Sequence, residues 1–268
     1  MFELLRQQFK NDDPVEVKIN KAREFLQNLA LKIAYDKNLF DSLAFVGGTA
    51  LRVLFDLRRF SEDLDFSVIN KKRYKFPAIK PLLEKQFNLY GLAPEINAKS
   101  DKNVHSLLLK FGGLLRNLGL SGLSSQKLSI KIEIDSNPPL GWKTESTLVN
   151  KTYLFNIVHF DLASLYSTKL HACFYRRFRK GRDFYDFIWY LSKKIKPNFL
   201  LLNNAITQTH GAHPVIGEHN FKGFLLENAK KVDFNEMRKD VERFLEDKGE
   251  LGLLEKNNVL RSINAVYG

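Results

Sequence analysis

The sequence predicts an α+β fold in which a small mixed sheet flanked by helices is followed by a C-terminal helical bundle. Strand-like alternation of apolar and polar residues occurs up to about residue 158, and helical periodicity dominates beyond it. The chain has 268 residues, which is long for a single hydrophobic core. We therefore expect two domains, residues 1–158 and 159–268.

The first elements form a strand–turn–helix–strand unit. Residues 14–36 are predicted to be an amphipathic helix, because apolar residues recur at helical spacing. The short apolar run 43–46 is typical of a buried strand and ends in two glycines. A short helix over 49–55 and a second strand over 64–68 follow, and we expect the two strands to pair.

The rest of the first domain is expected to hold a helix over residues 76–90 and strands over 104–111 and 127–135. The last strand alternates, with Lys131, Glu133 and Asp135 on one face and isoleucines on the other. Residues 112–125 are predicted to connect these two strands as a long hairpin loop. The pair Pro138-Pro139 is expected to end the strand region.

Helices are expected in the remainder of the chain. Asp161 is a suitable N-cap for a long helix that runs to about Arg179. Further helices are predicted over residues 183–193, 198–209, 234–247 and 254–266, with a polar loop over 210–219.

Composition limits the class of protein. Lys and Arg number 42 against 30 Asp and Glu, and nine basic residues lie between Lys169 and Lys196. Such a surface attracts the phosphates of nucleotides or nucleic acids, although a lysine-rich proteome would give the same total. Cys173 is the only cysteine, which excludes an intramolecular disulfide. No apolar stretch approaches a membrane span and no signal peptide is visible, so we expect a cytoplasmic protein.

The residues with the clearest chemistry lie in the segment FVGGTALRVLFDLRRFSEDLDFSV, residues 45–68. Its glycines Gly47 and Gly48 precede a predicted helix, whose first amides lack backbone partners and attract anions. Glycines let a phosphate approach the backbone closely, and the Thr49 hydroxyl could add a donor. The segment therefore predicts a triphosphate site.

Asp63 and Asp65 follow on the second predicted strand, where their side chains share one face. Leu64 and Phe66 then point into the core. Two adjacent carboxylates stay ionised most easily with a cation between them, and Mg²⁺ prefers oxygen ligands that it shares with phosphates. An Asp-x-Asp strand by itself is more often a solvated face; the glycine turn before it favours a metal site.

This combination resembles the nucleotidyltransferases of the DNA polymerase β type, whose signature joins a Gly-Gly or Gly-Ser turn to an Asp-x-Asp strand. The closer resemblance is to the AbiEii/AbiGii toxin family, with the pattern GGTAL…R-x-S-x-DLDF. The matching residues are Gly47, Gly48, Thr49, Ala50, Leu51, Arg59, Ser61, Asp63, Leu64, Asp65 and Phe66. The 14-residue spacer, 49–62, is slightly long for the superfamily. The resemblance covers about residues 40–192 and implies that Ser61 belongs to the nucleotide site.

A third carboxylate would complete the metal site. The superfamily takes it from a later strand, and the toxin family carries a similar Lys-x-Glu strand, which Glu133 matches. Asp135, on the same face, is the second choice, and Lys131 could contact a phosphate. An ordinary exposed amphipathic strand is the alternative.

A second matching segment, residues 162–191, holds a helical lysine, a basic stretch and Arg-Asp-x-Tyr-Asp. Lys169 would neutralise triphosphate charge, and Asp183 and Asp186 could orient Lys169 or Arg182. The alternative is a solvated Lys169, with the two carboxylates capping a helix and pairing with neighbouring arginines.

The resemblance implies NMP transfer from an NTP, with Mg²⁺ or Mn²⁺, to an acceptor hydroxyl. It further implies a toxin with a cognate antitoxin, and tRNA 3′ ends as the favoured acceptor. Three alternatives stay open: a glycosyltransferase that uses Asp-x-Asp with Mn²⁺, an enzyme that AMPylates proteins, and a non-catalytic RNA- or protein-binding module on the same fold.

Overall fold

A computed structural model describes residues 1–123 and 125–267. Ser124, within the predicted connection 112–125, and Gly268, the last residue of the predicted bundle 159–268, lie outside the described residues. The chain forms two compact units that interleave in sequence. Unit 1 comprises Met1–Ala50, Ser61–Asn137 and Ser146–His159, and unit 2 comprises Leu51–Phe60, Pro138–Glu145 and Phe160–Gly268.

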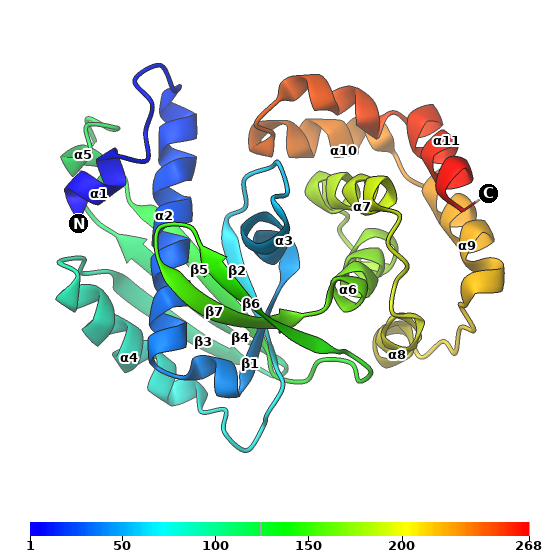
Figure 1. The fold of residues 1–268 in the computed structure, drawn as a ribbon, viewed down its shortest axis with the longest axis horizontal. Helices are drawn as coiled ribbons and strands as arrows, with labels where there is room; N and C mark the ends of the chain where they lie inside the picture. Colours follow the sequence, from blue (N-terminus) through cyan, green and yellow to red (C-terminus); the bar gives the residue numbers. More distant parts are fainter. Residues whose placement is uncertain (124, 268) are drawn as a thin grey trace. The chain divides into compact units, whose positions relative to one another are not determined.

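Unit 1 is built on a seven-stranded mixed sheet in the order β3-β4-β5-β2-β1-β7-β6 (Figure 1). The strands are β1 Leu43–Val46, β2 Asp63–Val68, β3 Glu95–Asp101, β4 Val104–Phe111, β5 Leu128–Asp135, β6 Thr144–Asn150 and β7 Leu154–Phe160. The expected pairing of β1 with β2 is confirmed and is antiparallel, whereas β2 pairs with β5 and β1 with β7 in parallel. The predicted mixed sheet is thus confirmed.

The prediction that strands end at Pro138-Pro139 is wrong, because β6 and β7 follow, and β3 was also missed. Of the three missed strands, β3 and β6 lie at the edges of the sheet, whereas β7 lies between β1 and β6. Each edge strand buries a single residue, Ile96 in β3 and Val149 in β6. An edge strand faces solvent along much of its length, so its sequence lacks the apolar alternation that identifies an inner strand.

Helices cover one face of the sheet in unit 1. Helix α2, Val15–Asp36, crosses the sheet, and α4, Phe76–Leu89, packs beside it (Figure 1). Both pack on the apolar side chains of β2 and β5, namely Leu64, Phe66, Ile132 and Ile134. The alternate residues of β2 and β5 therefore lie on the opposite face. Shorter helices in this unit are α1 Phe2–Arg6, the 3₁₀ turn Leu39–Asp41 and α5 Leu114–Asn117.

Unit 2 is helical, as predicted. Helix α3, Gly47–Phe55, begins in unit 1 and ends in unit 2. The remaining helices are α6 Leu162–Tyr175, α7 Gly181–Lys193, α8 Phe199–His210, α9 Glu218–Lys230, α10 Phe234–Val241 and α11 Lys256–Val266, with 3₁₀ turns at Glu242–Phe244 and Lys248–Leu254. Stacked aromatic rings such as Tyr166 and Tyr190, 4.3 Å between centroids, fill the core of this unit.

The capping residue of α6 was predicted correctly, since the Asp161 side chain accepts from the Ser164 backbone N–H at 2.8 Å. The predicted extension of this helix to Arg179 is wrong. The helix ends at Tyr175, and the backbone of Arg176 is extended. Residues 176–180 form an exposed connection with four basic residues. Closely spaced like charges disfavour a continued helix. In the part of the chain that the structure describes, no helix has both the length and the apolar character required to cross a membrane.

Candidate active site

The turn between β1 and α3 brings the backbone against a carboxylate of β2. Gly47 has φ +81°, in the left-handed region that favours glycine. A Cβ atom placed on Gly47 would lie 2.2 Å from Oδ2 of Asp65. Glycine is therefore required here both for the backbone conformation and for the close approach to Asp65.

We expect Gly47→Ala to lower the free energy of unfolding more than a strained φ alone would. Left-handed backbone at a non-glycine residue costs about 1–3 kcal/mol, and the clash with Asp65 adds to that cost. Gly91→Ala is the matched control, because Gly91 has φ +71° but no atom within 4 Å of a Cβ atom. Denaturant unfolding of both variants measures the difference. Equal losses of stability would contradict the close approach of Gly47 to Asp65.

Thr49 and Ser61 connect the turn to neighbouring elements. Thr49 is buried, and its hydroxyl donates a short hydrogen bond to the backbone carbonyl of Asp63. The group that Thr49 can offer a phosphate is therefore its backbone N–H in the first turn of α3, where amides lack helical acceptors. The Ser61 carbonyl accepts from Nε2 of Gln27 at 3.0 Å, which attaches the segment before β2 to α2.

The acidic residues meet across two parallel strands. In the β2–β5 pair, Asp65 lies opposite Glu133 and Asp63 lies opposite Lys131. Residues opposite each other in paired strands project to the same face, so these four side chains form one polar patch. The structure thus places Glu133 beside Asp65, as the sequence predicted.

A lysine already neutralises part of this patch. Nζ of Lys131 lies 2.5 Å from Oε1 of Glu133. The hydrogen bond to Glu133 raises the pKa of Lys131 despite partial burial, and the charges of Asp63 and Asp65 act in the same direction. Lys131 therefore supplies positive charge beside the three carboxylates, and its ammonium could pair with another anion in place of Glu133.

Carboxylate oxygens are the ligands that Mg²⁺ and Mn²⁺ prefer, so Asp63, Asp65 and Glu133 fit such a cation by their chemistry. Among residues 1–123 and 125–267, no three His, Cys, Asp or Glu side chains are already gathered around one point at ligand distance. Glu133 lies opposite Asp65 in the strand register and pairs with Lys131 at 2.5 Å.

Asp135, the second choice for a third ligand, has a different environment. It lies opposite Ser67, and its Oδ1 accepts from the Asn137 backbone N–H at 2.9 Å. Burial raises the pKa of Asp135 above its ordinary value. Position and hydrogen bonding therefore separate Asp135 from the patch formed around Asp65.

Unit 2 contains a buried ionic cluster built from both segments of the family-like pattern. Asp186 is fully buried and accepts two hydrogen bonds from Arg59, at 2.6 and 2.7 Å. Nζ of Lys169, on α6, lies 2.7 Å from Asp183 and 2.8 Å from Asp186, both on α7. Arg176 pairs with the other oxygen of Asp183 at 2.8 Å.

The cluster favours the charged form of Lys169. Burial alone would lower the pKa of Lys169, but Asp183 and then Asp186 raise it above its ordinary value. The cluster contains three basic side chains and two acidic ones, so its formal charge is +1. The basic residues are Arg59, Lys169 and Arg176, and the acidic residues are Asp183 and Asp186. A solvated Lys169, the alternative considered from the sequence, is wrong. Arg182, which was predicted beside these residues, lies over the Phe244 ring at 4.9 Å.

The cluster should make stability depend on pH. Burial would raise the pKa of Asp183, but Lys169 and Arg176 outweigh it and hold the pKa below its ordinary value. Its stabilisation is therefore present above a pH of about 4 and lost as the pH falls through the lowered pKa. We expect wild type to exceed Asp183→Asn in unfolding free energy at pH 7 and to lose that advantage progressively as the pH falls below about 4. A difference independent of pH would contradict the charged state of Asp183.

Sequence reasoning missed Arg59 as a functional residue. Its signal was present, since Arg59 is part of the R-x-S-x-DLDF pattern, but its partner Asp186 lies 127 residues further along the chain. Backbone contacts hold Arg59 in place as well: it forms a β-bridge with Leu245, and the Phe60 N–H donates to the Phe244 carbonyl at 2.8 Å.

Comparisons with known proteins identify a family and similar folds. Residues 30–261 match a family described as the nucleotidyl transferase AbiEii toxin of type IV toxin–antitoxin systems. Two crystal structures from Helicobacter pylori share the fold. JHP933 has a TM-score of 0.51 and 17% identity and covers 91% of this chain and 90% of its own. A candidate nucleotidyltransferase has a TM-score of 0.52 and 18% identity, with coverages of 90% and 94%. No curated protein matches the sequence.

Proposed function

Because this chain belongs to the AbiEii nucleotidyl transferase toxin family, we propose that it transfers NMP from an NTP to an acceptor hydroxyl, with the tRNA 3′ end as the favoured acceptor. The family is one of type IV toxins, which implies a nucleotide substrate and an antitoxin partner. One observation supports the reaction best. Asp65 lies opposite Glu133 in the register of β2 and β5, and the Gly47 backbone closely approaches Asp65.

In this proposal Asp63, Asp65 and Glu133 hold Mg²⁺ or Mn²⁺. Such a cation would supply positive charge that offsets the negative charge of the triphosphate during transfer. Lys131, which pairs with Glu133 at 2.5 Å and whose side chain is 44% exposed, could turn its ammonium to a phosphate if Glu133 served as a ligand.

We propose two sets of nucleotide contacts, each described within its own unit. In unit 1, the α3 N-terminus at Gly47, Gly48 and Thr49 offers backbone N–H groups to the phosphates, and Ser61 adds a hydroxyl. In unit 2, Asp183 and Asp186 orient Lys169, which supplies positive charge together with Arg182. The acceptor hydroxyl attacks the α-phosphorus, a P–O bond forms, and pyrophosphate leaves with the electron pair of the broken bond while the hydroxyl proton is lost.

An RNA acceptor is supported by the connection between α6 and α7. Residues 176–180 read Arg-Arg-Phe-Arg-Lys and are all exposed. Arg176 pairs with Asp183, and the other three cations of this segment favour a phosphate backbone, while the exposed Phe178 ring can stack on a base. We place the reaction in the cytoplasm, where tRNA and NTPs are available.

Removal of divalent cations should abolish the reaction. We expect purified protein treated with EDTA to transfer no label from α-labelled NTPs to total tRNA, and excess Mg²⁺ to restore transfer. The reason is that Asp63, Asp65 and Glu133 would otherwise repel both each other and the triphosphate. Transfer at an undiminished rate in EDTA would contradict the role proposed for these carboxylates.

The same assay separates the acceptor classes when tRNA and total protein are supplied together. Label in RNA supports the proposal, whereas label in protein alone identifies an AMPylating or NMPylating enzyme on the same chemistry. Absence of label from both acceptors, with all four NTPs and either metal, would leave a non-catalytic RNA- or protein-binding module.

A further inference from the structure

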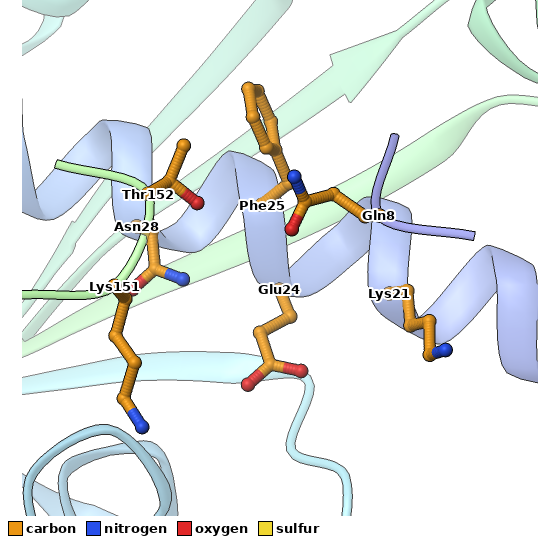
Figure 2. A pocket seen from close by; sticks show the side chains of 7 residues that line it. All are labelled: Gln8, Lys21, Glu24, Phe25, Asn28, Lys151 and Thr152. Carbon is orange, nitrogen blue, oxygen red and sulfur yellow. The ribbon is translucent and has the colours of Figure 1, made fainter. Parts of the chain in front are cut away.

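A polar cavity of about 350 Å³ lies in unit 1, apart from the acidic patch of β2 and β5. It is bounded by Gln8 of the N-terminal segment, by α2, and by Lys151 and Thr152 of the turn between β6 and β7 (Figure 2). Its volume lies within the range of roughly 300–1,000 Å³ typical of small-molecule sites. The cavity is large enough for one nucleoside-sized ligand.

Asn28 lines this cavity, and in the described part of the chain its side-chain oxygen lacks a hydrogen-bond donor. The residue is only 5% exposed, and its Oδ1 is buried with no hydrogen-bond partner among the described residues. A buried amide oxygen without a donor costs about 1–3 kcal/mol. Asn203 shows the usual solution in this protein, since its amide donates to and accepts from the Ile216 backbone.

The other lining groups indicate which ligand satisfies Asn28. A primary amide presents a donor and an acceptor side by side, which matches the donor–acceptor edge of a nucleobase. Figure 2 shows the ammonium groups of Lys151 and Lys21 on either side of the cavity, with the Glu24 carboxylate between them. Nζ of Lys21 already pairs with Asp13 at 2.6 Å, so the phosphate of a nucleotide would compete with that carboxylate, and the carboxylate of Glu24 suits a ribose hydroxyl.

We propose that this cavity binds a nucleobase, and that Asn28 reads its donor–acceptor edge. The proposal rests on the proposed function for the source of the base, which is either the NTP or a nucleotide of the acceptor RNA. The cavity is connected to the acidic strand: Gln27, the neighbour of Asn28, donates to the Ser61 carbonyl at 3.0 Å, two residues before Asp63. A base bound here therefore contacts the helix that positions the start of β2.

Calorimetric titration of the full chain with adenosine, guanosine, cytidine and uridine tests this without turnover. We expect at least one nucleoside to bind wild type, and Asn28→Leu to weaken that binding about tenfold or more, the effect of losing two hydrogen bonds. The same substitution should raise the thermal midpoint, because it removes an unpaired buried amide. Asn203→Leu is the control: it should lower the thermal midpoint and leave nucleoside binding unchanged.

Two arms distinguish the sources of the base. If the base belongs to the NTP, NTPs displace the bound nucleoside and Asn28→Leu raises KM for NTP alone. If it belongs to the acceptor, a single-stranded oligoribonucleotide displaces the nucleoside and the KM for RNA rises. Either result supports the cavity as a nucleobase site.

Other results overturn the inference. It fails if no nucleoside, NTP or oligoribonucleotide binds differently to Asn28→Leu, or if that variant is destabilised as Asn203→Leu is. Failure of the proposed function has a different signature. If only the proposed function is wrong, wild type binds a nucleoside through Asn28 but transfers no nucleotide. If only the nucleobase site is wrong, nucleotide transfer is normal and nucleoside binding does not depend on Asn28.

Discussion

Asp65→Asn is expected to reduce nucleotide transfer on the order of 1,000-fold while the protein stays folded. Asn preserves the shape of the side chain, so the fit against the Gly47 backbone is kept and only the charge is lost. Asp65 is the carboxylate shared between the glycine turn and Glu133 on the neighbouring strand. Single-turnover transfer from a labelled NTP, with protein and metal in excess, measures the loss at the chemical step.

Asp135→Asn is the matched control for this prediction. Asp135 lies on the same face of β5 two residues beyond Glu133, but opposite Ser67 rather than an aspartate. We expect a change of activity within a few-fold. The Asp65→Asn variant should also unfold at the same or a higher temperature than wild type, because it relieves repulsion among neighbouring carboxylates. A loss of activity that is equal in both variants would contradict the site built around Asp65.

Asp186→Ala is expected to destabilise unit 2 by about 3–5 kcal/mol, the effect of breaking a buried ion pair by removal of one partner. Asp186 is fully buried, accepts both hydrogen bonds from Arg59 and pairs with Lys169. Its removal leaves the buried Arg59 guanidinium without its carboxylate. Equilibrium unfolding in denaturant, followed by aromatic fluorescence, gives the change in free energy.

Two further variants show whether burial explains this effect. Glu246→Gln removes the partner of Arg52 at 2.7 Å, but Glu246 is 38% exposed, so we expect a cost of at most about 1 kcal/mol. The double variant Arg59→Met with Asp186→Leu should recover much of the lost stability, because it removes both buried charges. Recovery of stability without recovery of transfer would separate the structural role of the cluster from a catalytic one. Equal costs for Asp186→Ala and Glu246→Gln would contradict the buried pair.

The strand–turn–helix–strand unit could be predicted because its signals are local. Two apolar strands, a glycine pair and an Asp-x-Asp alternation lie within residues 43–68, and each has a direct physical consequence. The amphipathic pattern of β5 likewise identified the face of Glu133, and the register with β2 places that residue opposite Asp65. Sequence reasoning therefore predicted the strands around the glycine turn and the alternating strand β5, although it missed the inner strand β7.

The parts that could not be predicted depend on contacts distant in sequence. Edge strands β3 and β6 lack apolar alternation, so nothing local identifies them. Arg59 and Asp186 form an ion pair although they lie 127 positions apart in the sequence. The Thr49 hydroxyl donates to the Asp63 carbonyl, a contact that depends on the path of β2. The expected division at residue 158 treats each domain as one continuous segment. In the structure, residues 51–60 belong to the same compact unit as the C-terminal helices.

The central claim is that Asp63 and Asp65 hold the cation that supports nucleotide transfer to RNA. Mass analysis of cellular RNA and protein, after expression of wild type and of Asp63→Ala, tests it most directly. We expect tRNA from cells with wild type to gain nucleotides at its 3′ end and tRNA from cells with Asp63→Ala to gain none. Modified protein with unaltered tRNA, or the same extended tRNA in both samples, would contradict it.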